Sequence, residues 1–405
     1  MRALYTLALH LALPLVLLRL WRRGRAEPGY REHVAERFGV YDAERPARLI
    51  WLHAVSVGEA RAAQPLVRSL ASQFPDHRIL ITCTTAAGRE TIRQVYGESV
   101  LAAFLPYDLP WAVQRFLEHF RPRLAVLMET EIWPNLIAGC AGMAVPVLLA
   151  NARLSDSSAR GYQRWDRLVR PAFTALGSVC AQSAADADRL RALGARNVEV
   201  TGSLKFDVHP DEGQIAAGRA WHRELARNVV LLASTREGEE RLLLDAWRGE
   251  ALVVVVPRHP RRFDEVAQWA QSRRSRQPRP QSGERVHLGD TMGEMAFYYG
   301  ACDVAVIGGS FAPLGGQNLI EALAAGAAVV LGPHMYNFSE ATALAVQAGA
   351  AIQVGDAAAA MHEARALIAD PARRKAMGHA GRALCAAHRG ATERHMQACR
   401  RLLGL

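Results

Sequence analysis

The chain alternates short apolar runs with longer amphipathic stretches. Continuous apolar runs of this length are typical of strands that are covered on both faces, and the stretches between them have helical spacing. The pattern therefore predicts a parallel sheet with helices on both sides. The runs of the first half lie at 47–55, 78–85, 101–108, 123–131, 145–155, 177–183 and 197–204.

The same pattern starts again further along the chain. Five more apolar runs lie at 228–235, 252–259, 285–291, 303–310 and 327–334. The polar stretch 207–218 is a predicted linker between the two series, and the Pro/Arg-rich stretch 273–283 is a predicted solvated loop. We therefore predict an α/β fold with two Rossmann-like domains, 26–207 and 208–405, facing a central cleft, and allow for the final helix packing back on the first domain.

An apolar stretch at 3–18 opens the sequence. As a helix, about 16 residues span ~24 Å, somewhat less than a hydrocarbon core of ~30 Å. Arginines at 19, 22, 23 and 25 follow it, and such charges favour the cytoplasmic side. We predict an uncleaved membrane anchor over residues 1–25 with the body in the cytoplasm; the alternative is a buried helix of the soluble core. Whether the anchor spans the bilayer or lies within one leaflet stays open.

The net charge of +10 narrows the choice of partners. It arises from 49 basic and 39 acidic residues among 405, and excess positive charge suits nucleic acid, an anionic membrane or a phosphorylated substrate. Nucleic acid is the weaker choice, because no recognisable binding motif and no basic block interleaved with aromatic residues is present, and we predict no nucleic-acid partner. The six cysteines lie far apart, which argues against a disulfide framework or a structural zinc site. Lys205 and Lys375 are the only lysines, so an ammonium at either position merits a closer look.

Three groups of candidate residues follow strands of the first half, and ligands of such sheets bind at the carboxyl ends of strands. Glu59 lies where a helix begins, and it could act as a general base or merely complement the helix dipole. Glu129 and Glu131 end an apolar run; on a strand they would share a face, and a bend would separate them. A charge there is costly unless it is hydrogen-bonded or used. Lys205 ends the last run before the linker and could meet developing phosphate charge.

The second half offers an anion site at its own strand ends. Arg258 and His259 provide a cation and an imidazole, and a glycine pair at 315–316 precedes a predicted helix whose free N–H groups could bind an anion. The sequence has no HExxH, GxSxG or P-loop motif, which argues against a metalloprotease, an α/β-hydrolase and a P-loop kinase. The remaining candidates here are Gly293, Glu294, Met295, Asn318, Leu319, Ile320, Glu321 and Ala322.

Several of these segments together resemble a known family. The motifs HAVSVGE, LPYDLP, METEIWPN, NARLS, TGSLKFD, VPRHP, GDTMGEM, GGS and GPHMYNF occur in this order and resemble those of the 3-deoxy-D-manno-octulosonic acid (Kdo) transferases of lipopolysaccharide assembly. The resemblance implies a GT-B fold, one anchor in the inner membrane, and inverting transfer of Kdo from CMP-Kdo to lipid IVA, the lipid A precursor, with no metal or other cofactor.

The resemblance also implies roles for the candidates. Glu59 would be the base, while Glu131, with Glu129 as its rival, and Lys205 would stabilise the transition state. Arg258, His259 and the segments 293–295 and 318–322 would bind CMP. The chain departs from the family pattern at 312–314 and Gln317, where charged residues and a histidine are expected.

Two other functions compete with this one. The first is a GT-B glycosyltransferase or epimerase that uses a UDP-sugar, and the second is a membrane-tethered protein that binds nucleotide or anionic lipid without catalysis. The number of sugars transferred and the oligomeric state cannot be read from the sequence.

Overall fold

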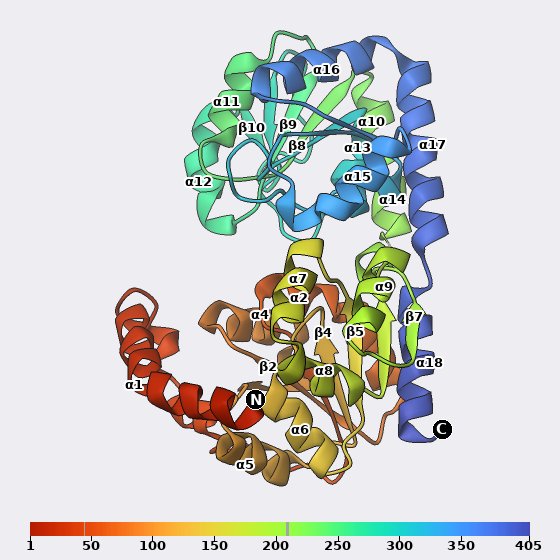
Figure 1. Cartoon of the computed structure of the whole chain (residues 1–405). Helices are drawn as coiled ribbons and strands as arrows, with labels where there is room; N and C mark the ends of the chain where they lie inside the picture. Colours follow the sequence, from red (N-terminus) through yellow and green to blue (C-terminus); the bar gives the residue numbers. More distant parts are fainter. Residues whose placement is uncertain (44, 208–209) are drawn as a thin grey trace. The chain divides into compact units, whose positions relative to one another are not determined.

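The computed structural model describes residues 1–43, 45–207 and 210–405 and divides the chain into two compact units (Figure 1). Unit 1 comprises Met1–Asp207 together with Arg389–Leu405, and unit 2 comprises Val208–His388. Each unit is built on its own sheet.

Within the described residues, the sheet of unit 1 has seven parallel strands in the order β3-β2-β1-β4-β5-β6-β7. Its central strands are buried along their whole length, as the continuous apolar runs predict. The strands are β1 (Leu49–His53), β2 (Arg78–Cys83), β3 (Val100–Phe104), β4 (Leu124–Met128), β5 (Val147–Ala152), β6 (Ser178–Ala181) and β7 (Val198–Val200).

Helices connect these strands and enclose a hydrophobic cluster on each face of the sheet. The helices of unit 1 are α1 (Arg2–Ala26), α2 (Val57–Ala62), α3 (Gln64–Gln73), α4 (Ala86–Tyr96), α5 (Pro110–Phe120), α6 (Pro134–Gly142), α7 (Asp156–Arg164), α8 (Asp166–Thr174), α9 (Ala184–Ala192) and α18 (Ala391–Leu403), with 3-10 turns η1 (Pro28–Tyr30), η2 (Val34–Phe38), η3 (Gly97–Ser99) and η4 (Leu204–Phe206).

The sheet of unit 2 is also parallel, with seven strands among the residues described, in the order β10-β11-β9-β8-β12-β13-β14. The two edge strands β10 and β14 are not among the five predicted. The strands are β8 (Val229–Thr235), β9 (Leu252–Pro257), β10 (Ser272–Arg273), β11 (Val286–Leu288), β12 (Val304–Ile307), β13 (Ala328–Leu331) and β14 (Ala351–Gln353).

The predicted linker is shorter than expected. Helix α10 begins at Glu212, where the Asp211 side chain accepts a hydrogen bond from the Gln214 N–H at 3.0 Å. The linker prediction is therefore wrong from Glu212 onward, and its residues 208–209 lie outside the described residues. The helices of unit 2 are α10 (Glu212–Leu225), α11 (Glu239–Ala246), α12 (Phe263–Val266), α13 (Met295–Ala301), α14 (Ile320–Ala325), α15 (Ser339–Gln347), α16 (Ala357–Ala369) and α17 (Pro371–His388), with η5 (Pro260–Arg262), η6 (Ala267–Trp269) and η7 (Tyr336–Phe338).

The last helix, α18, belongs to unit 1 although unit 2 precedes it in the sequence. Its residues Met396 and Cys399 are buried in the same cluster as strands β4 to β6. At its start, the Asp207 carboxylate accepts hydrogen bonds from the Gly390 N–H at 2.7 Å and from the Thr392 N–H. The chain end therefore completes the core of unit 1.

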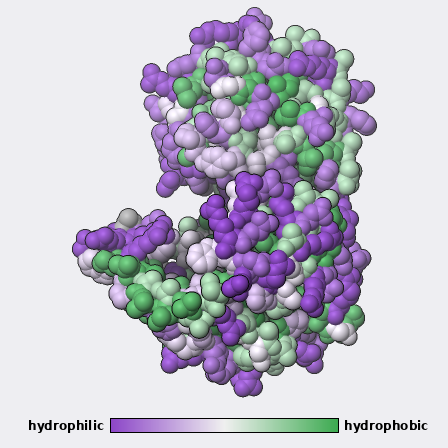
Figure 2. Space-filling model, viewed as in Figure 1, coloured by the Kyte–Doolittle hydropathy of each residue, from purple (hydrophilic) through white to green (hydrophobic). Residues whose placement is uncertain are grey.

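Helix α1 is long and apolar enough to cross a membrane by length and composition. None of its most apolar window is buried, so the alternative of a buried core helix is wrong. Figure 2 shows hydrophobic residues along it, and Leu7, Leu11 and Leu15 are each more than half exposed. Its amino end is nevertheless attached to the unit, because the Tyr5 hydroxyl donates to Asp108 Oδ2 at 3.0 Å.

Candidate active site

Glu59 lies in the first turn of α2, directly after β1. Its Oε2 accepts a hydrogen bond from the Val55 N–H at 2.9 Å, and its Oε1 accepts one from the Ser56 hydroxyl at 2.8 Å. Ser56 in turn caps the helix by accepting from the Glu59 N–H. The carboxylate therefore stabilises the start of the helix, and each of its oxygens has a further lone pair that can accept a hydrogen bond or a proton.

Burial raises the pKa of Glu59 to about 7, against the opposing effect of the Val55 and Ser56 hydrogen bonds. The negative charges of Glu129 and Glu131 also raise this pKa. The structure thus brings the three predicted carboxylates into one electrostatic neighbourhood. At neutral pH, Glu59 is poised between its charged and its neutral form.

The two acids of the METE motif follow β4 instead of ending it. The strand stops at Met128, and Glu129 adopts a left-handed φ of 56° in the turn beyond it. The predicted strand over 123–131 is therefore wrong at its carboxyl end, and the alternative of a bend at this point is confirmed. Glu131 accepts a hydrogen bond from Trp133 Nε1 at 2.9 Å, while burial and the charge of Glu129 raise its pKa.

Lys205 lies on η4 in unit 1, half-buried, and a network centred on Asn151 holds its backbone. Asn151 Oδ1 accepts a hydrogen bond from the Leu204 N–H at 3.0 Å. The Asn151 N–H donates to His395 Nε2 of α18 at 2.8 Å, so the last helix supports the segment that carries the lysine.

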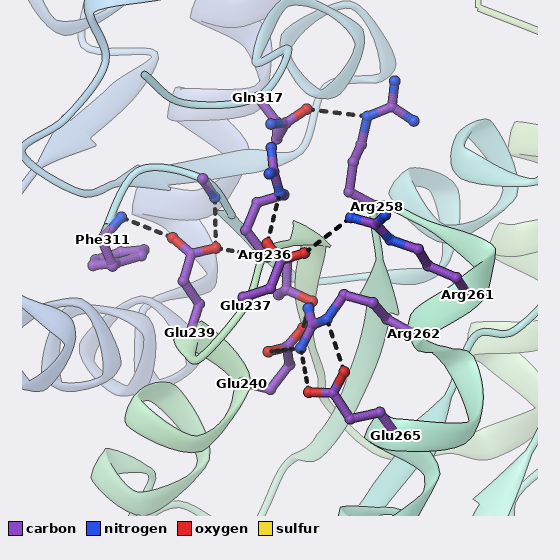
Figure 3. Close-up of polar contacts among 12 residues, drawn as sticks. Arg236, Glu237, Glu239, Glu240, Arg258, Arg261, Arg262, Glu265, Phe311 and Gln317 are labelled. Carbon is purple, nitrogen blue, oxygen red and sulfur yellow. Dashed lines mark hydrogen bonds and ion pairs between the residues drawn. The ribbon is translucent and has the colours of Figure 1, made fainter. Parts of the chain in front are cut away.

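Unit 2 gathers positive charge where β8 and β9 end. Arg258 Nε donates to Gln317 Oε1 at 3.1 Å (Figure 3). Burial lowers the pKa of His259, and the positive charges of Arg236, Arg258 and Arg261 lower it further. The same arginine charges favour the binding of an anion beside His259. Gln317 is one of the positions at which the chain departs from the family pattern, and its hydrogen bond orients Arg258, which is predicted to bind CMP.

Two buried acids hold the loops that present these cations. Glu239 accepts backbone hydrogen bonds from Arg236, Gly309 and Phe311 at 2.9, 2.6 and 2.9 Å. Glu240 forms a bidentate pair with Arg262 at 2.6 and 3.0 Å, and both side chains are fully or nearly buried. Because each carboxylate is satisfied by several donors, the loops at the ends of β8, β9 and β12 are fixed relative to one another.

The other predicted residues of unit 2 differ in what they can offer a ligand. Gly293 has a φ of 80°. Arg274 donates a hydrogen bond to the Glu294 carboxylate at 2.8 Å, which lowers the pKa of Glu294. Asn318 donates a hydrogen bond to Glu321 Oε1 at 2.9 Å. The side chains of Leu319, Ile320 and Ala322 are fully buried, so only the backbone of these residues could contact a ligand. Met295 is the first residue of α13.

Comparison with known proteins decides the family. A family model described as 3-deoxy-D-manno-octulosonic-acid transferase (kdotransferase) matches residues 32–208. The 3-deoxy-D-manno-octulosonic acid transferase of Bordetella pertussis is 46% identical over 429 residues, with both chains covered in full. The chain belongs to the Kdo transferase family. A second member, from Haemophilus influenzae, is 34% identical over 414 residues, covering 97% of this chain and 96% of that protein.

The two-domain architecture of this Kdo transferase family member has wider structural relatives. The crystal structure of the UDP-GlcNAc 2-epimerase from Neisseria meningitidis matches with a TM-score of 0.56 at 15% identity, covering 87% of this chain and 100% of that chain. At this identity the likeness concerns the fold alone. The predicted fold, two parallel-sheet α/β domains of the GT-B type, is confirmed.

The sequence reading of this Kdo transferase family member missed Arg236 and Glu239. Both lie just beyond β8, so the rule that sites form at the carboxyl ends of strands could have found them. The part of the chain that the structure describes contains no group of three or more His, Cys, Asp or Glu side chains arranged to hold a metal ion. Metal-independent chemistry stays a prediction.

Proposed function

We propose that this protein transfers Kdo from CMP-Kdo to lipid IVA, the lipid A precursor, in lipopolysaccharide biosynthesis, with inversion at the anomeric carbon and Glu59 as the general base. The observation that carries the proposal is the Glu59 carboxylate, which has a pKa near 7 and lies at the carboxyl end of β1. A general base works best when its pKa is close to the operating pH.

In the proposed reaction Glu59 takes the proton of an acceptor hydroxyl. The hydroxyl oxygen attacks the anomeric carbon of Kdo, and the bond from that carbon to the CMP phosphate oxygen breaks, so that CMP leaves with the bonding electrons. Glu131, or its rival Glu129, and Lys205 would stabilise the charge that develops. The mutual effects of the three acids on their pKa values support this grouping.

On the donor side, Arg258 and His259 would bind the phosphate of CMP. Arg236, which faces the same neighbourhood, would add a third cationic or polar group. CMP-Kdo carries a single phosphate, so less leaving-group charge needs neutralising than with a pyrophosphate. The hydrogen bond from Arg258 to Gln317 supports this assignment, because it fixes the guanidinium before the ligand arrives.

For the membrane, we propose that α1 lies in the cytoplasmic leaflet of the inner membrane and does not cross it. Tyr5, near one end of the helix, is hydrogen-bonded to Asp108 of the body. Near the other end, Arg31 donates to the Trp21 carbonyl at 3.0 Å as the chain turns back. The amino end is therefore tied to the body and the other end to the chain that turns back after it, which favours an in-plane helix with its exposed leucines in the acyl chains.

The first test is transfer by purified wild type and Glu59→Gln, with CMP-Kdo and lipid IVA, following CMP release and product mass. We expect Glu59→Gln to lower kcat by about 100-fold or more while CMP still binds, since a positioned base contributes roughly 10²–10⁴. The exposed Glu98→Gln is the matched control and should behave as wild type.

Two outcomes of this test would contradict the proposal. If the wild-type enzyme releases no CMP in the presence of acceptor, the proposed transfer of Kdo is contradicted, and UDP-sugars would be tested as donors next. If Glu59→Gln has the kcat of wild type, Glu59 is not the general base, and its carboxylate only stabilises the start of α2.

A further inference from the structure

Four arginines lie close together in the sequence just after β5. Arg160 and Arg164 are one turn apart on α7, Arg153 precedes the helix, and Arg167 follows in the first turn of α8. All four side chains are exposed, and Figure 2 shows a hydrophilic surface over α7. We call these four residues the α7 arginine face.

The nearby acids are already engaged by other arginines. Asp156 pairs with Arg189 at 2.8 Å, and Asp166 pairs with Arg170 at 2.8 Å. Within residues 1–43, 45–207 and 210–405, no carboxylate lies within ion-pairing distance of the α7 arginine face. Exposed guanidinium groups on one short segment, with no paired carboxylate among the described residues, create a local positive potential that attracts anions.

The face is attached to the turn that carries the catalytic candidates. Thr130, between Glu129 and Glu131, donates its hydroxyl to the Arg153 carbonyl at 2.9 Å. The Tyr162 hydroxyl of α7 contacts the Thr130 carbonyl at 3.4 Å. Burial raises the pKa of Tyr162, and the charge of Glu131 raises it further. The segment that carries Arg153, Arg160 and Arg164 is therefore attached to the METE turn.

We propose that the α7 arginine face binds a phosphate group of the acceptor and so orients the acceptor hydroxyl toward Glu59. Guanidinium groups form bidentate, charge-assisted hydrogen bonds with phosphate oxygens. Trp165, which is 59% exposed between Arg164 and Arg167, offers an aromatic surface to the sugar that carries the phosphate. The inference rests on the proposed function, because it assumes a phosphorylated acceptor.

A bilayer headgroup would offer the same chemistry, and two observations favour the acceptor. The segment that carries the face is hydrogen-bonded to the METE turn through the Arg153 carbonyl and the Tyr162 hydroxyl, and in the proposed reaction the acceptor binds near that turn. The exposed leucines that suit a bilayer belong to a different element, α1.

The test compares Arg160→Gln/Arg164→Gln with wild type in detergent, using lipid IVA and the same lipid after enzymatic removal of its phosphates. We expect the double variant to raise KM for the phosphorylated acceptor by about tenfold or more and to leave kcat within about twofold. The preference of wild type for the phosphorylated acceptor should shrink by the same factor. Thermal unfolding of the variant should match wild type, since both side chains are exposed.

The matched control is Arg123→Gln/Arg196→Gln. Both arginines are exposed and precede the amino ends of strands β4 and β7, whereas the α7 arginine face follows the carboxyl end of β5. This variant has the same net charge as the test variant, and its KM should equal that of wild type. An equal rise of KM in both variants would overturn the specific site in favour of a general charge effect.

Three further outcomes would overturn the inference while leaving the proposed function intact. The first is an unchanged KM in Arg160→Gln/Arg164→Gln, and the second is an equal loss with the dephosphorylated acceptor. The third is wild-type kinetics in detergent combined with weaker binding to phosphatidylglycerol vesicles, which would assign the face to the bilayer. Absence of CMP release by wild type would instead overturn the proposed function, and this inference with it.

Discussion

The Glu59 carboxylate stabilises the start of α2 and, in our proposal, is also the general base of the reaction. Its surroundings act on its pKa in opposite directions. Burial and the charges of Glu129 and Glu131 raise it, whereas the hydrogen bonds from Val55 and Ser56 lower it. The pKa of about 7 is the balance of these effects, so single substitutions should move it either way.

We expect Ser56→Ala and Glu129→Gln to shift the acidic limb of the kcat/KM profile in opposite directions. Loss of the Ser56 hydroxyl removes a donor to the charged form, so the pKa of Glu59 rises and activity begins at higher pH. Loss of the Glu129 charge lowers that pKa, so activity begins at lower pH. Each shift should be on the order of half a unit, or ~0.7 kcal/mol.

The pH dependence of kcat/KM with CMP-Kdo at saturating acceptor concentration measures both shifts. The midpoint is the readout, because Glu129→Gln could also change the maximal rate. Movement of both midpoints in the same direction would contradict the assignment of the limb to Glu59.

At the scale of elements, the apolar runs predicted every central strand, because a strand buried on both faces leaves a continuous hydrophobic signature. The carboxyl ends of these strands were harder to predict. At Glu129 and Asn151 the chain turns through positive φ values of 56° and 52°, which an apolar pattern does not encode. The candidate site depends on these turns, so the mutual geometry of its candidate residues could not be predicted.

Long-range support of the site could not be predicted either. His395 accepts a hydrogen bond from Asn151, 244 positions away, and lies in a tail with little recognisable signature. The buried Glu239 joins the loops that follow β8 and β12 by accepting hydrogen bonds from three backbone N–H groups, a role that cannot be predicted from the sequence before the loops are placed. Local pattern therefore indicated candidate residues, whose roles stay predictions, but not the contacts that hold them.

Helix α1 gives a prediction about membrane attachment. Leu7, Leu11 and Leu15 are 55%, 73% and 70% exposed, and each would contribute roughly 1.5–3 kcal/mol when fully buried among acyl chains. We expect the triple substitution to serine to move most of the protein from the membrane fraction to the supernatant. The melting temperature in detergent should stay within about 2 °C of wild type.

The control for this prediction is serine at Val200, Leu242 and Val346, which are exposed hydrophobic residues outside α1. Fractionation of cell lysates at high salt compares the two variants. Retention of the α1 variant in the membrane fraction would contradict the proposed anchor.

At the scale of the whole molecule, the net charge of +10 is compatible with both proposed anionic ligands. The two units carry separate candidate sites, the acids in unit 1 and the cationic group around Arg258 in unit 2. Nucleotide binding can therefore be tested independently of transfer.

We expect CMP to bind more tightly than UMP, and Arg258→Gln to weaken CMP binding by about 10- to 100-fold, because a charge-assisted hydrogen bond contributes roughly 1.5–3 kcal/mol. Isothermal titration calorimetry measures both. Arg365→Gln, at an exposed position on α16, is the control. Tighter binding of UMP would favour the UDP-sugar alternative, and unchanged CMP affinity in Arg258→Gln would remove that residue from the nucleotide site.

The return of α18 to unit 1 has a consequence for synthesis of the protein. A ribosome translates all of unit 2 before it reaches the residues that cover strands β4 to β6. Until then, the face of unit 1 that receives Met396 and Cys399 lacks its cover, and nascent chains with exposed apolar surface are prone to aggregate. Messages that end early therefore yield an incomplete unit 1 even though its first 207 residues are intact, so only a fully translated chain can complete the core that supports Glu59 and Lys205.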